Sequence, residues 1–304
     1  MGLVETPPSS NFLISIENMK AALKSKEASR AARLNNAKQG EVFNCRVIEF
    51  IIHPIVSGHQ AFMSELESFI AESFERGIQH GQVLVACPTY DSSSEESIGI
   101  HWLAMDFDYR DGQANFFLID ASGDQRGKLV AQKMADYSET FAKMANKDND
   151  KSQVFLTFGG IQNSTGTCAG FAWDHVRQLS LMGSGFYRQL SGSQSELSLI
   201  KGVVNISRYD LPGALLRNAQ SWSFISSFML LSEHSSEKVS RKGEDLESYA
   251  SEHSREKTAE EIEKRSSPSR LQNHSVFRSF ANLFKHAQPT PEARSDQGVV
   301  ALEV

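Results

Sequence analysis

The sequence predicts an α+β protein in which a mixed β-sheet is flanked by helices. Strand-like apolar runs alternate with longer amphipathic stretches through the middle of the chain. An Asp-Gly pair joins two of these runs in the manner of a β-hairpin. The chain has 304 residues, of which 40% are hydrophobic, so it can bury one sizeable core. Both flanks are polar and are expected to lie outside that core.

The first half of the predicted core alternates strand, helix and strand. Residues 41–52 and 81–88 are apolar runs typical of buried strands. Residues 60–77, between them, carry apolar side chains at the spacing of an amphipathic helix. Residues 1–40, before the core, are polar, and the stretch Lys20–Lys38 is rich in Lys, Arg and Ala, which suits a surface helix.

A hairpin is predicted next. Residues 98–109 and 115–122 are strand-like, and the connection between them contains the Asp-Gly pair of a tight turn. His101 opens the first strand and Asp120 closes the second. Because the start of one strand lies beside the end of the next in an antiparallel hairpin, we expect these two side chains to be neighbours.

The second half of the core is predicted to contain a helix, a strand and another helix, over residues 127–146, 152–160 and 168–182. The polar loop 161–167 leads into the last helix, which Cys168 opens. A helix N-terminus favours the thiolate form of a cysteine, because its dipole and its unpaired N–H groups stabilise negative charge.

The C-terminal part of the chain, residues 232–304, is expected to be polar and disordered in part, because it is rich in Ser, Glu and Lys as far as Arg270. Apolar residues near 276–284 fall on one helical face and predict an amphipathic segment. The predicted organisation is therefore a polar segment over 1–40, a core over 41–231 and this C-terminal region.

Composition disfavours several classes of protein. A formal net charge of −6 argues against a general nucleic-acid binder, which needs surplus Lys and Arg to neutralise phosphates. Three cysteines without a CxxC pair indicate neither a disulfide framework nor a zinc site, and no metal site is expected. Cys45 and Cys87 lie in apolar runs and are predicted to be structural. No run of eighteen apolar residues predicts a membrane span.

The N-terminus carries a candidate lipidation site. Gly2 and Thr6 match the acceptor pattern for N-myristoylation after removal of Met1. One myristoyl chain binds membranes only marginally, so stable anchoring needs a second signal.

One set of residues has the functional groups that a thiol enzyme needs. Such an enzyme needs a thiolate, a base, a group that orients the base, and donors for the developing oxyanion. We assign these roles to Cys168, His101, Asp120 and Gln162, with the Gln162 side chain sharing the oxyanion hole with backbone N–H groups near the cysteine.

Plain structural interpretations compete with these roles. A lone cysteine that opens an apolar helix is more often a small buried hydrophobe, His101 fits a satisfied core histidine, and Asp120 fits a turn or helix-capping residue. Asp106 competes with Asp120 as the orienting carboxylate, but it lies too far along the strand of His101 to reach the imidazole without a bend.

The same residues carry a resemblance to a known family. Residues 99–107, 111–112 and 117–120 resemble the block of YopJ-family bacterial effectors that contains their catalytic His and acidic residue. Residues 161–164 and 168–171 resemble the block that contains their Gln and Cys, and both spacings match the family layout. The chain is also similar to that family, more weakly, over residues 210–220. His101 followed by Trp102 resembles the related ubiquitin-like-protein proteases.

The resemblance implies a fold and an activity. The fold is the core of a ubiquitin-like-protein protease with a helical regulatory lobe built from the N- and C-terminal segments. The activity is transfer of an acetyl group from acetyl-CoA to Cys168, and from there to Ser, Thr or Lys of host signalling or immune proteins, which suppresses immune signalling. Inositol hexakisphosphate is implied as activator. Candidate basic residues for this polyanion are Arg46, Lys201, Arg208 and Arg217.

The resemblance also implies a location: secretion by a bacterium into a host cell, at the plasma membrane if Gly2 is myristoylated and in the cytoplasm otherwise. Three positions depart from the family pattern. Asp120 stands where many members have Glu, Gly166-Thr167 replaces a common Ser-Glu, and Arg217 stands where members often have a self-acetylated Lys, so that Lys201 is an alternative acceptor.

Two other functions remain open on the sequence. A cysteine protease or deubiquitinase would use the same four residues. A host-protein binder with little turnover is suggested by the changes at Gly166-Thr167 and Arg217.

Overall fold

The computed structural model describes most of the chain up to Glu252, and every described residue lies within one compact unit, Met1–Glu260. The described residues are 14–34, 43–51, 58–90, 97–110, 112–144, 152–162, 167–192 and 200–252. The predicted amphipathic segment near 276–284 and the candidate lipidation site at Gly2 lie outside them.

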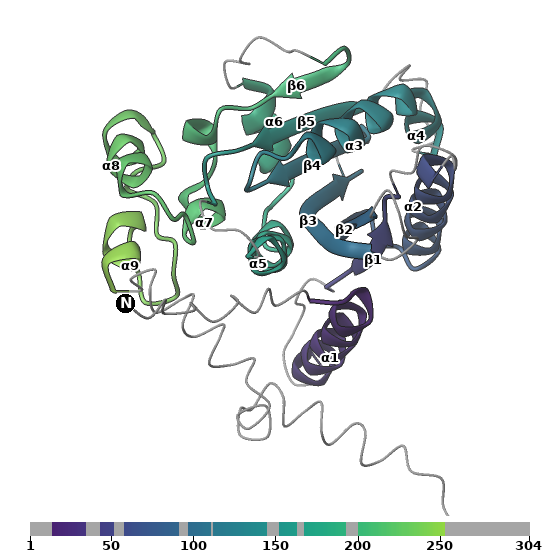
Figure 1. The fold of residues 1–304 in the computed structure, drawn as a ribbon, viewed down its shortest axis with the longest axis horizontal. Helices are drawn as coiled ribbons and strands as arrows, with labels where there is room; N and C mark the ends of the chain where they lie inside the picture. Colours follow the sequence, from purple (N-terminus) through teal and green to yellow (C-terminus); the bar gives the residue numbers. More distant parts are fainter. Residues whose placement is uncertain are drawn as a thin grey trace, which may run out of the picture. The chain divides into compact units, whose positions relative to one another are not determined.

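A six-stranded mixed sheet forms the centre of this unit (Figure 1). Its strands follow one another in chain order, with β2–β3 and β3–β4 antiparallel and the other neighbours parallel. The strands are β1 (Cys45–Glu49), β2 (His80–Tyr90), β3 (Ser97–Asp108), β4 (Asn115–Asp120), β5 (Gln153–Phe158) and β6 (Val203–Asn205).

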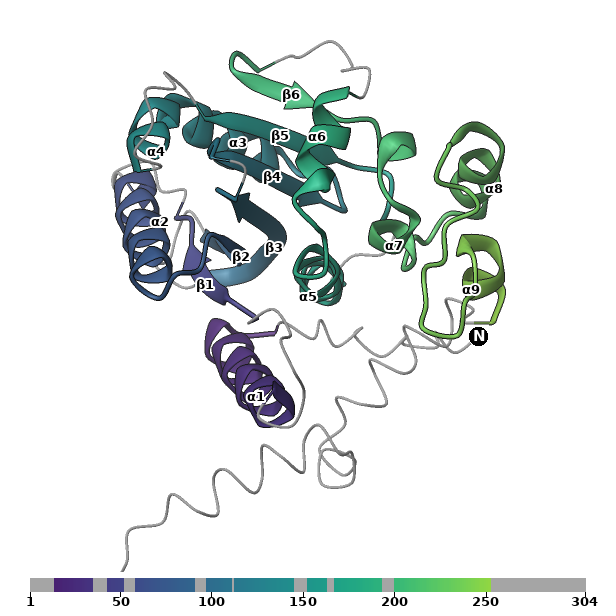
Figure 2. The ribbon, with the colours of Figure 1, turned by 180° about the vertical axis from the view of Figure 1, so that it is seen from behind.

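Helices cover both faces of the sheet (Figures 1 and 2). One face packs on α2 (Gly58–Glu75), α3 (Gln125–Asp136) and α4 (Ser138–Met144). On the other face, α5 (Cys168–Leu179) packs on the sheet, and the same apolar layer is completed by α1 (Ile16–Leu34), α6 (Gly185–Gly192), α7 (Gly213–Leu216), α8 (Trp222–Leu231) and α9 (Leu246–Glu252). A short 3₁₀ turn, Arg208–Asp210, precedes α7. The predicted class, a mixed sheet flanked by helices, is confirmed.

Alternation along the strands divides the core into these two layers. Leu103 and Met105 of β3 point into the layer of α2, α3 and α4, whereas Trp102 and Ala104 point into the layer of α5. Because both faces are covered, the strands read as continuous apolar runs rather than alternating ones. This explains why the sequence predicts buried strands throughout.

The hairpin predicted from the Asp-Gly pair is present. Strands β3 and β4 are antiparallel, with Ala104 opposite Ile119, and Gly112 in the connection has a φ of +74°, a conformation that favours glycine. In this register the end of β4 lies beside the middle of β3, close to His101, because β3 extends past β4 to Ser97.

Some boundaries differ from those predicted. The single helix expected over 127–146 is two helices, α3 and α4, with a break at Tyr137 that places Phe141 against Phe116, with ring centroids 4.8 Å apart. Packing also continues beyond residue 231, because Val239, Leu246 and Ala250 are buried. These few apolar residues are diluted among Ser, Glu and Lys, so composition alone does not reveal them.

The surface helix expected in the N-terminal segment is present as α1. It buries Ile16, Met19 and Leu23 in the layer of α5, so one face of this polar helix belongs to the core. Among the described helices, none is long and apolar enough to cross a membrane.

Candidate active site

His101 and Asp120 are neighbours, as the hairpin predicts. The distance between His101 Nε2 and Asp120 Oδ2 is 3.0 Å, and the two residues are 7% and 0% exposed. A buried carboxylate that accepts a hydrogen bond from one ring nitrogen fixes the tautomer and leaves the other nitrogen to face a reaction partner.

The turn after β4 holds the Asp120 carboxylate from its other side. Oδ1 accepts hydrogen bonds from Ser122 N at 3.1 Å, from Ser122 Oγ at 3.0 Å and from Gly123 N at 3.2 Å. Gly123 has a φ of +75°, a conformation that favours glycine. Oδ1 is therefore occupied by the turn, and Oδ2 is presented to His101.

Cys168 begins α5, as the sequence predicts, and lies beside the histidine. Its Sγ is 3.7 Å from the carbonyl oxygen of Ile100, the residue before His101, and the side chain is half-buried. Helix α5 packs across β3, which brings a residue far along the chain to the part of β3 that carries His101. The three predicted residues therefore come together at one end of the sheet.

The charges and hydrogen bonds around His101 favour its protonated form. Burial lowers the pKa of His101, but hydrogen bonds and charges from Asp120 and Cys168 outweigh that effect and raise the pKa to about 9. An imidazolium beside a sulfur is the arrangement that activates a thiol nucleophile near neutral pH.

Gln162 lies on a loop that is tied to the same turn. The backbone N–H groups of Ile161 and Gln162 donate to the carbonyl of Ala121 at 3.2 and 2.9 Å, and Gly159 N donates to Asp120 O at 2.8 Å. The backbone of Gln162 is thus fixed one residue from Asp120. Residues 163–166, which connect this loop to the cysteine, lie outside the described residues, and an oxyanion role for Gln162 stays a prediction.

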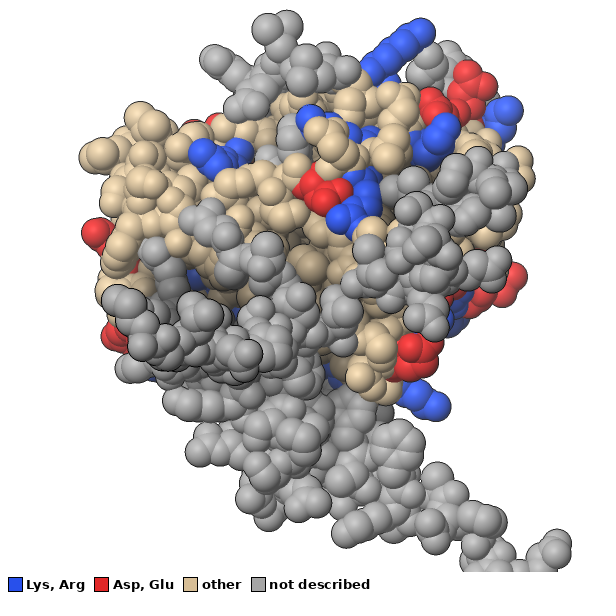
Figure 3. All heavy atoms as spheres, in the orientation of Figure 1, with Lys and Arg blue, Asp and Glu red and all other residues tan. Residues whose placement is uncertain are grey.

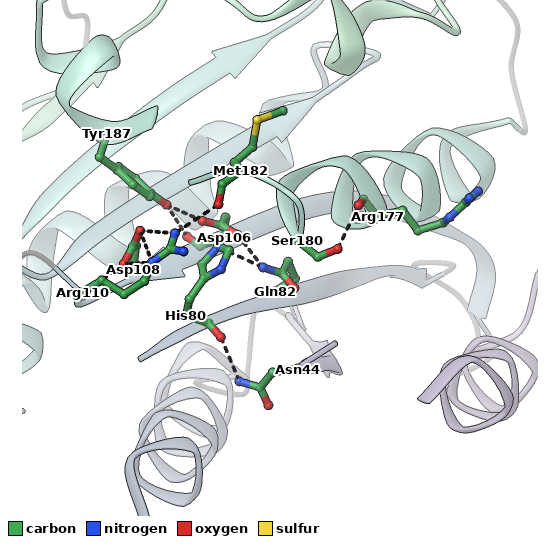
Figure 4. A network of polar contacts seen from close by, with 10 residues as sticks. All are labelled: Asn44, His80, Gln82, Asp106, Asp108, Arg110, Arg177, Ser180, Met182 and Tyr187. Carbon is green, nitrogen blue, oxygen red and sulfur yellow. Dashed lines mark hydrogen bonds and ion pairs between the residues drawn. The ribbon is translucent and has the colours of Figure 1, made fainter. Parts of the chain in front are cut away.

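The competing carboxylate, Asp106, is engaged elsewhere (Figure 4). Its Oδ1 is 2.9 Å from His80 Nε2 and accepts from Gln82 Nε2 at 2.8 Å, and its Oδ2 accepts from Tyr187 OH at 2.8 Å. Asp106 is fully buried and belongs to this separate network. It does not orient His101.

The other two cysteines are buried. Cys45 is 6% exposed and Cys87 is fully buried, and burial raises the pKa of both thiols well above the ordinary value. A thiol that stays protonated is a poor nucleophile. Among the described residues, no group of three His, Cys, Asp or Glu side chains could hold a metal ion.

An ion pair beside the site escaped the sequence analysis. Arg126 donates from Nε and Nη2 to the two oxygens of Asp124, each at 2.7 Å, and from Nη1 to Thr89 Oγ1 at the end of β2. Hydrogen bonding and charge from Arg126 lower the pKa of Asp124 to about 2. Asp124 is also the N-cap of α3, a role that an Asp after Gly123 could have signalled.

Two of the four predicted basic residues are paired with carboxylates. Arg46 donates to both oxygens of Glu72, at 3.2 and 2.5 Å, and lies over the ring of Phe69. Arg217 donates from Nε to Asp174 at 2.8 Å and makes a second bond to the same carboxylate. Local acidic residues thus already compensate these two charges.

The other two predicted basic residues, Arg208 and Lys201, have different surroundings. The Arg208 guanidinium lies 4.8 Å from the ring centroid of Phe224 and directly against Gly160, whereas Lys201 is exposed in the turn before β6. Arg46 is on β1, at one edge of the sheet, whereas Arg208 follows β6, the strand at the other edge, and lies against Gly160 beyond β5. The visible Lys and Arg side chains in Figure 3 are likewise scattered, with acidic ones among them. The four residues do not form one cluster.

A cysteine, a histidine and a carboxylate arranged in this way, with the base oriented by the carboxylate, are the arrangement of thiol-dependent enzymes. The family model described as YopJ Serine/Threonine acetyltransferase matches residues 56–274 of the chain. The chain therefore belongs to the YopJ family of acetyltransferases.

Two solved structures are similar to the chain. A structure of AvrA delL154 with IP6 and CoA is 17% identical, covers 81% of this chain and 88% of its own, and has a TM-score of 0.48. A crystal structure of HopZ1a in complex with IP6 is 12% identical, covers 76% of this chain and 77% of its own, and has a TM-score of 0.45. No curated protein matches the chain.

Proposed function

We propose that this protein transfers an acetyl group from acetyl-CoA to Ser, Thr or Lys side chains of host proteins through an acetyl-Cys168 intermediate. The observation that carries the proposal is the His101–Asp120 hydrogen bond beside Cys168, in a chain of the YopJ family. Asp120 holds the imidazole, His101 moves the proton, and Cys168 carries the acetyl group.

The first half-reaction forms the intermediate. His101 takes the thiol proton, and the Cys168 thiolate attacks the carbonyl carbon of the thioester. The tetrahedral oxyanion is stabilised by the Gln162 side chain and backbone N–H groups. When the intermediate collapses, the bond from carbon to the CoA sulfur breaks, and the departing thiolate takes the proton from His101.

The second half-reaction transfers the acetyl group from Cys168 to the acceptor. The acceptor hydroxyl or amine attacks the carbonyl carbon of acetyl-Cys168 while neutral His101 accepts its proton. The bond to Cys168 breaks, and the thiolate and imidazolium are restored together. Because the first half-reaction removes one proton from His101 and the second returns one, a single histidine serves both.

We also propose activation by inositol hexakisphosphate, which is supported by the family resemblance and by the presence of IP6 in the AvrA and HopZ1a structures. The four predicted cations do not fit one polyanion site, since Arg46 is on β1, at one edge of the sheet, whereas Arg208 follows β6, the strand at the other edge. No step of the reaction above depends on this activator.

The proposed targets are host signalling or immune proteins, reached after secretion by a bacterium into the host cell. Plasma-membrane attachment through myristoylated Gly2 is part of the proposal, with the host cytoplasm as the location without it. Lys201 is exposed and is the proposed self-acetylation site, because Arg217 replaces the usual lysine.

The experiment is incubation of purified protein with radiolabelled acetyl-CoA, with and without inositol hexakisphosphate. Label on the wild type and on Cys45→Ala, but not on Cys168→Ala, is the expected result. If the folded wild type never acquires label under either condition, the acetyltransferase proposal fails.

A second candidate is a cysteine protease or deubiquitinase, because water in place of the acceptor would discharge an acyl-cysteine formed from a peptide or isopeptide bond. The His101-Trp102 pair favours it. Cleavage of ubiquitin-like conjugates that is lost in Cys168→Ala would support this function. A host effect that survives Cys168→Ala would instead indicate a binding protein.

A further inference from the structure

Helix α3 approaches the Asp120 carboxylate at a residue without a side chain. A Cβ built on Gly127 would lie 2.6 Å from Asp120 Oδ2 and 3.0 Å from Asp120 Cβ. Real Cβ atoms essentially never come closer than 3.0 Å to another heavy atom, so the contact with Oδ2 would force either the carboxylate or the helix to move. Oδ2 is also the oxygen that contacts His101 Nε2, at 3.0 Å.

The conformation of Gly127 does not require glycine. It is a buried residue in the first turn of α3 and is not among the residues with positive φ. At such a position alanine is the better helix former, by about 0.5–1 kcal/mol. Local propensity thus argues against glycine here, and the close approach to Asp120 is the feature that accounts for it.

We propose that Gly127 is a positioning residue for the reaction. Its bare Cα lets α3 close on Oδ2 of Asp120, while Ser122 and Gly123 hold Oδ1, so the carboxylate is confined between the turn and the helix and points at His101. The proposal rests on the function above only in taking Cys168 as the nucleophile that His101 activates.

The test is the rate at which iodoacetamide alkylates Cys168 as a function of pH, followed by mass spectrometry of its peptide. This readout needs no acetyl-CoA. In Gly127→Ala, the displaced carboxylate no longer stabilises the imidazolium, so His101 holds the proton of Cys168 less firmly. We expect alkylation at pH 6 to be about tenfold slower than in the wild type, which corresponds to a fall of one unit in the pKa of His101.

Gly185→Ala is the matched control. Gly185 also lies in the first turn of a helix, α6, and a Cβ there would meet nothing within 4 Å. Gly185→Ala should leave the dependence of the Cys168 alkylation rate on pH unchanged. Equal slowing in this control would overturn the proposal, because the effect would then belong to helix substitution in general.

A double-mutant cycle separates positioning from general damage. If Gly127 acts through the carboxylate, adding Gly127→Ala to Asp120→Ala changes the alkylation rate no further. A tenfold loss that persists in the Asp120→Ala background would overturn the proposal. So would a Gly127→Ala protein with the wild-type profile.

Three remaining outcomes are also decisive. If Gly127→Ala does not fold, Ser122→Ala, which adds no atoms and removes one donor to Oδ1, should slow alkylation at pH 6 in the same direction, and no slowing overturns the proposal. If wild-type Cys168 reacts like a free thiol, no activated pair exists to be positioned, and the nucleophile assignment fails as well. Label transfer without an effect of Gly127→Ala would reject this inference alone.

Discussion

Asp120 is the residue on which the behaviour of His101 depends. Its carboxylate is fully buried, and its two oxygens have separate partners: the turn at Ser122 and Gly123, and the imidazole. Burial alone would lower the pKa of His101, so the value of about 9 reflects the carboxylate together with the thiol of Cys168.

Replacing Asp120 with Asn tests this dependence. The amide is nearly the same size but carries no charge, so we expect the pKa of His101 to fall from about 9 toward the ordinary value of about 6.5. Acetyl transfer at pH 7 should fall about a hundredfold or more, as is typical when a general base loses its support. NMR titration of the imidazole measures the first effect. A pKa that stays near 9 in Asp120→Asn would contradict it.

At the scale of elements, α5 and α7 are joined by a charged pair. Its arginine, Arg217, is one of the residues that the sequence analysis gives as candidates for polyanion binding. Arg217 ends α7 and bonds Asp174 of α5, and its guanidinium lies 5.8 Å from the ring of Tyr249 on α9. Asn218 donates to the same carboxylate at 2.9 Å. Arg217 therefore ties three helices together.

Arg217→Met tests the role of this pair. The substitution keeps an apolar stem but leaves the Asp174 side chain, which is only 8% exposed, without its main counter-charge. We expect the free energy of unfolding to fall by about 2 kcal/mol, less than for a fully buried pair because Arg217 retains some exposure. Urea unfolding measures it. Arg241→Met, at an exposed arginine, is the control, and an equal loss there would contradict the assignment.

For the molecule as a whole, buried histidines set the pH range of stability. His101 has a raised pKa of about 9, so its contribution is fully present below about pH 6.5 and is lost as the pH rises through 9. Burial lowers the pKa of His175 to about 4, so its contribution is fully present above about pH 6.5 and is lost as the pH falls through 4. The pKa of His80 is raised by Asp106 despite burial, which adds to the alkaline loss.

Thermal unfolding should therefore show a maximum Tm near pH 6.5, with losses toward pH 9 and toward pH 4. The alkaline loss should shrink in His101→Gln, which has no proton to release. Scanning calorimetry across this range measures both sides. A Tm that rises steadily from pH 6.5 to 9 would contradict the assignment of raised pKa values.

Local sequence alone determined several features correctly. The hairpin predicted His101 beside Asp120 because an antiparallel pair joined by a short turn has one dominant geometry, and the polar loop before an apolar run predicted Cys168 at a helix start. Buried strands could be recognised because sheets covered on both faces need continuous apolar runs.

The tertiary structure decided the rest, because contacts between distant parts of the chain leave no local signal. Asp106 and its partner Tyr187 are 81 residues apart in the sequence, and Arg217 and its partner Asp174 are 43 residues apart. Sequence spacing therefore could not predict that these charged groups already have partners. Sheet order alone separates Arg46 from Arg208. Gly127 looks like an ordinary helix glycine until α3 is packed against Asp120. Periodicity and turn chemistry act over a few residues, whereas charge pairing and close approach are settled only when the layers of the fold meet.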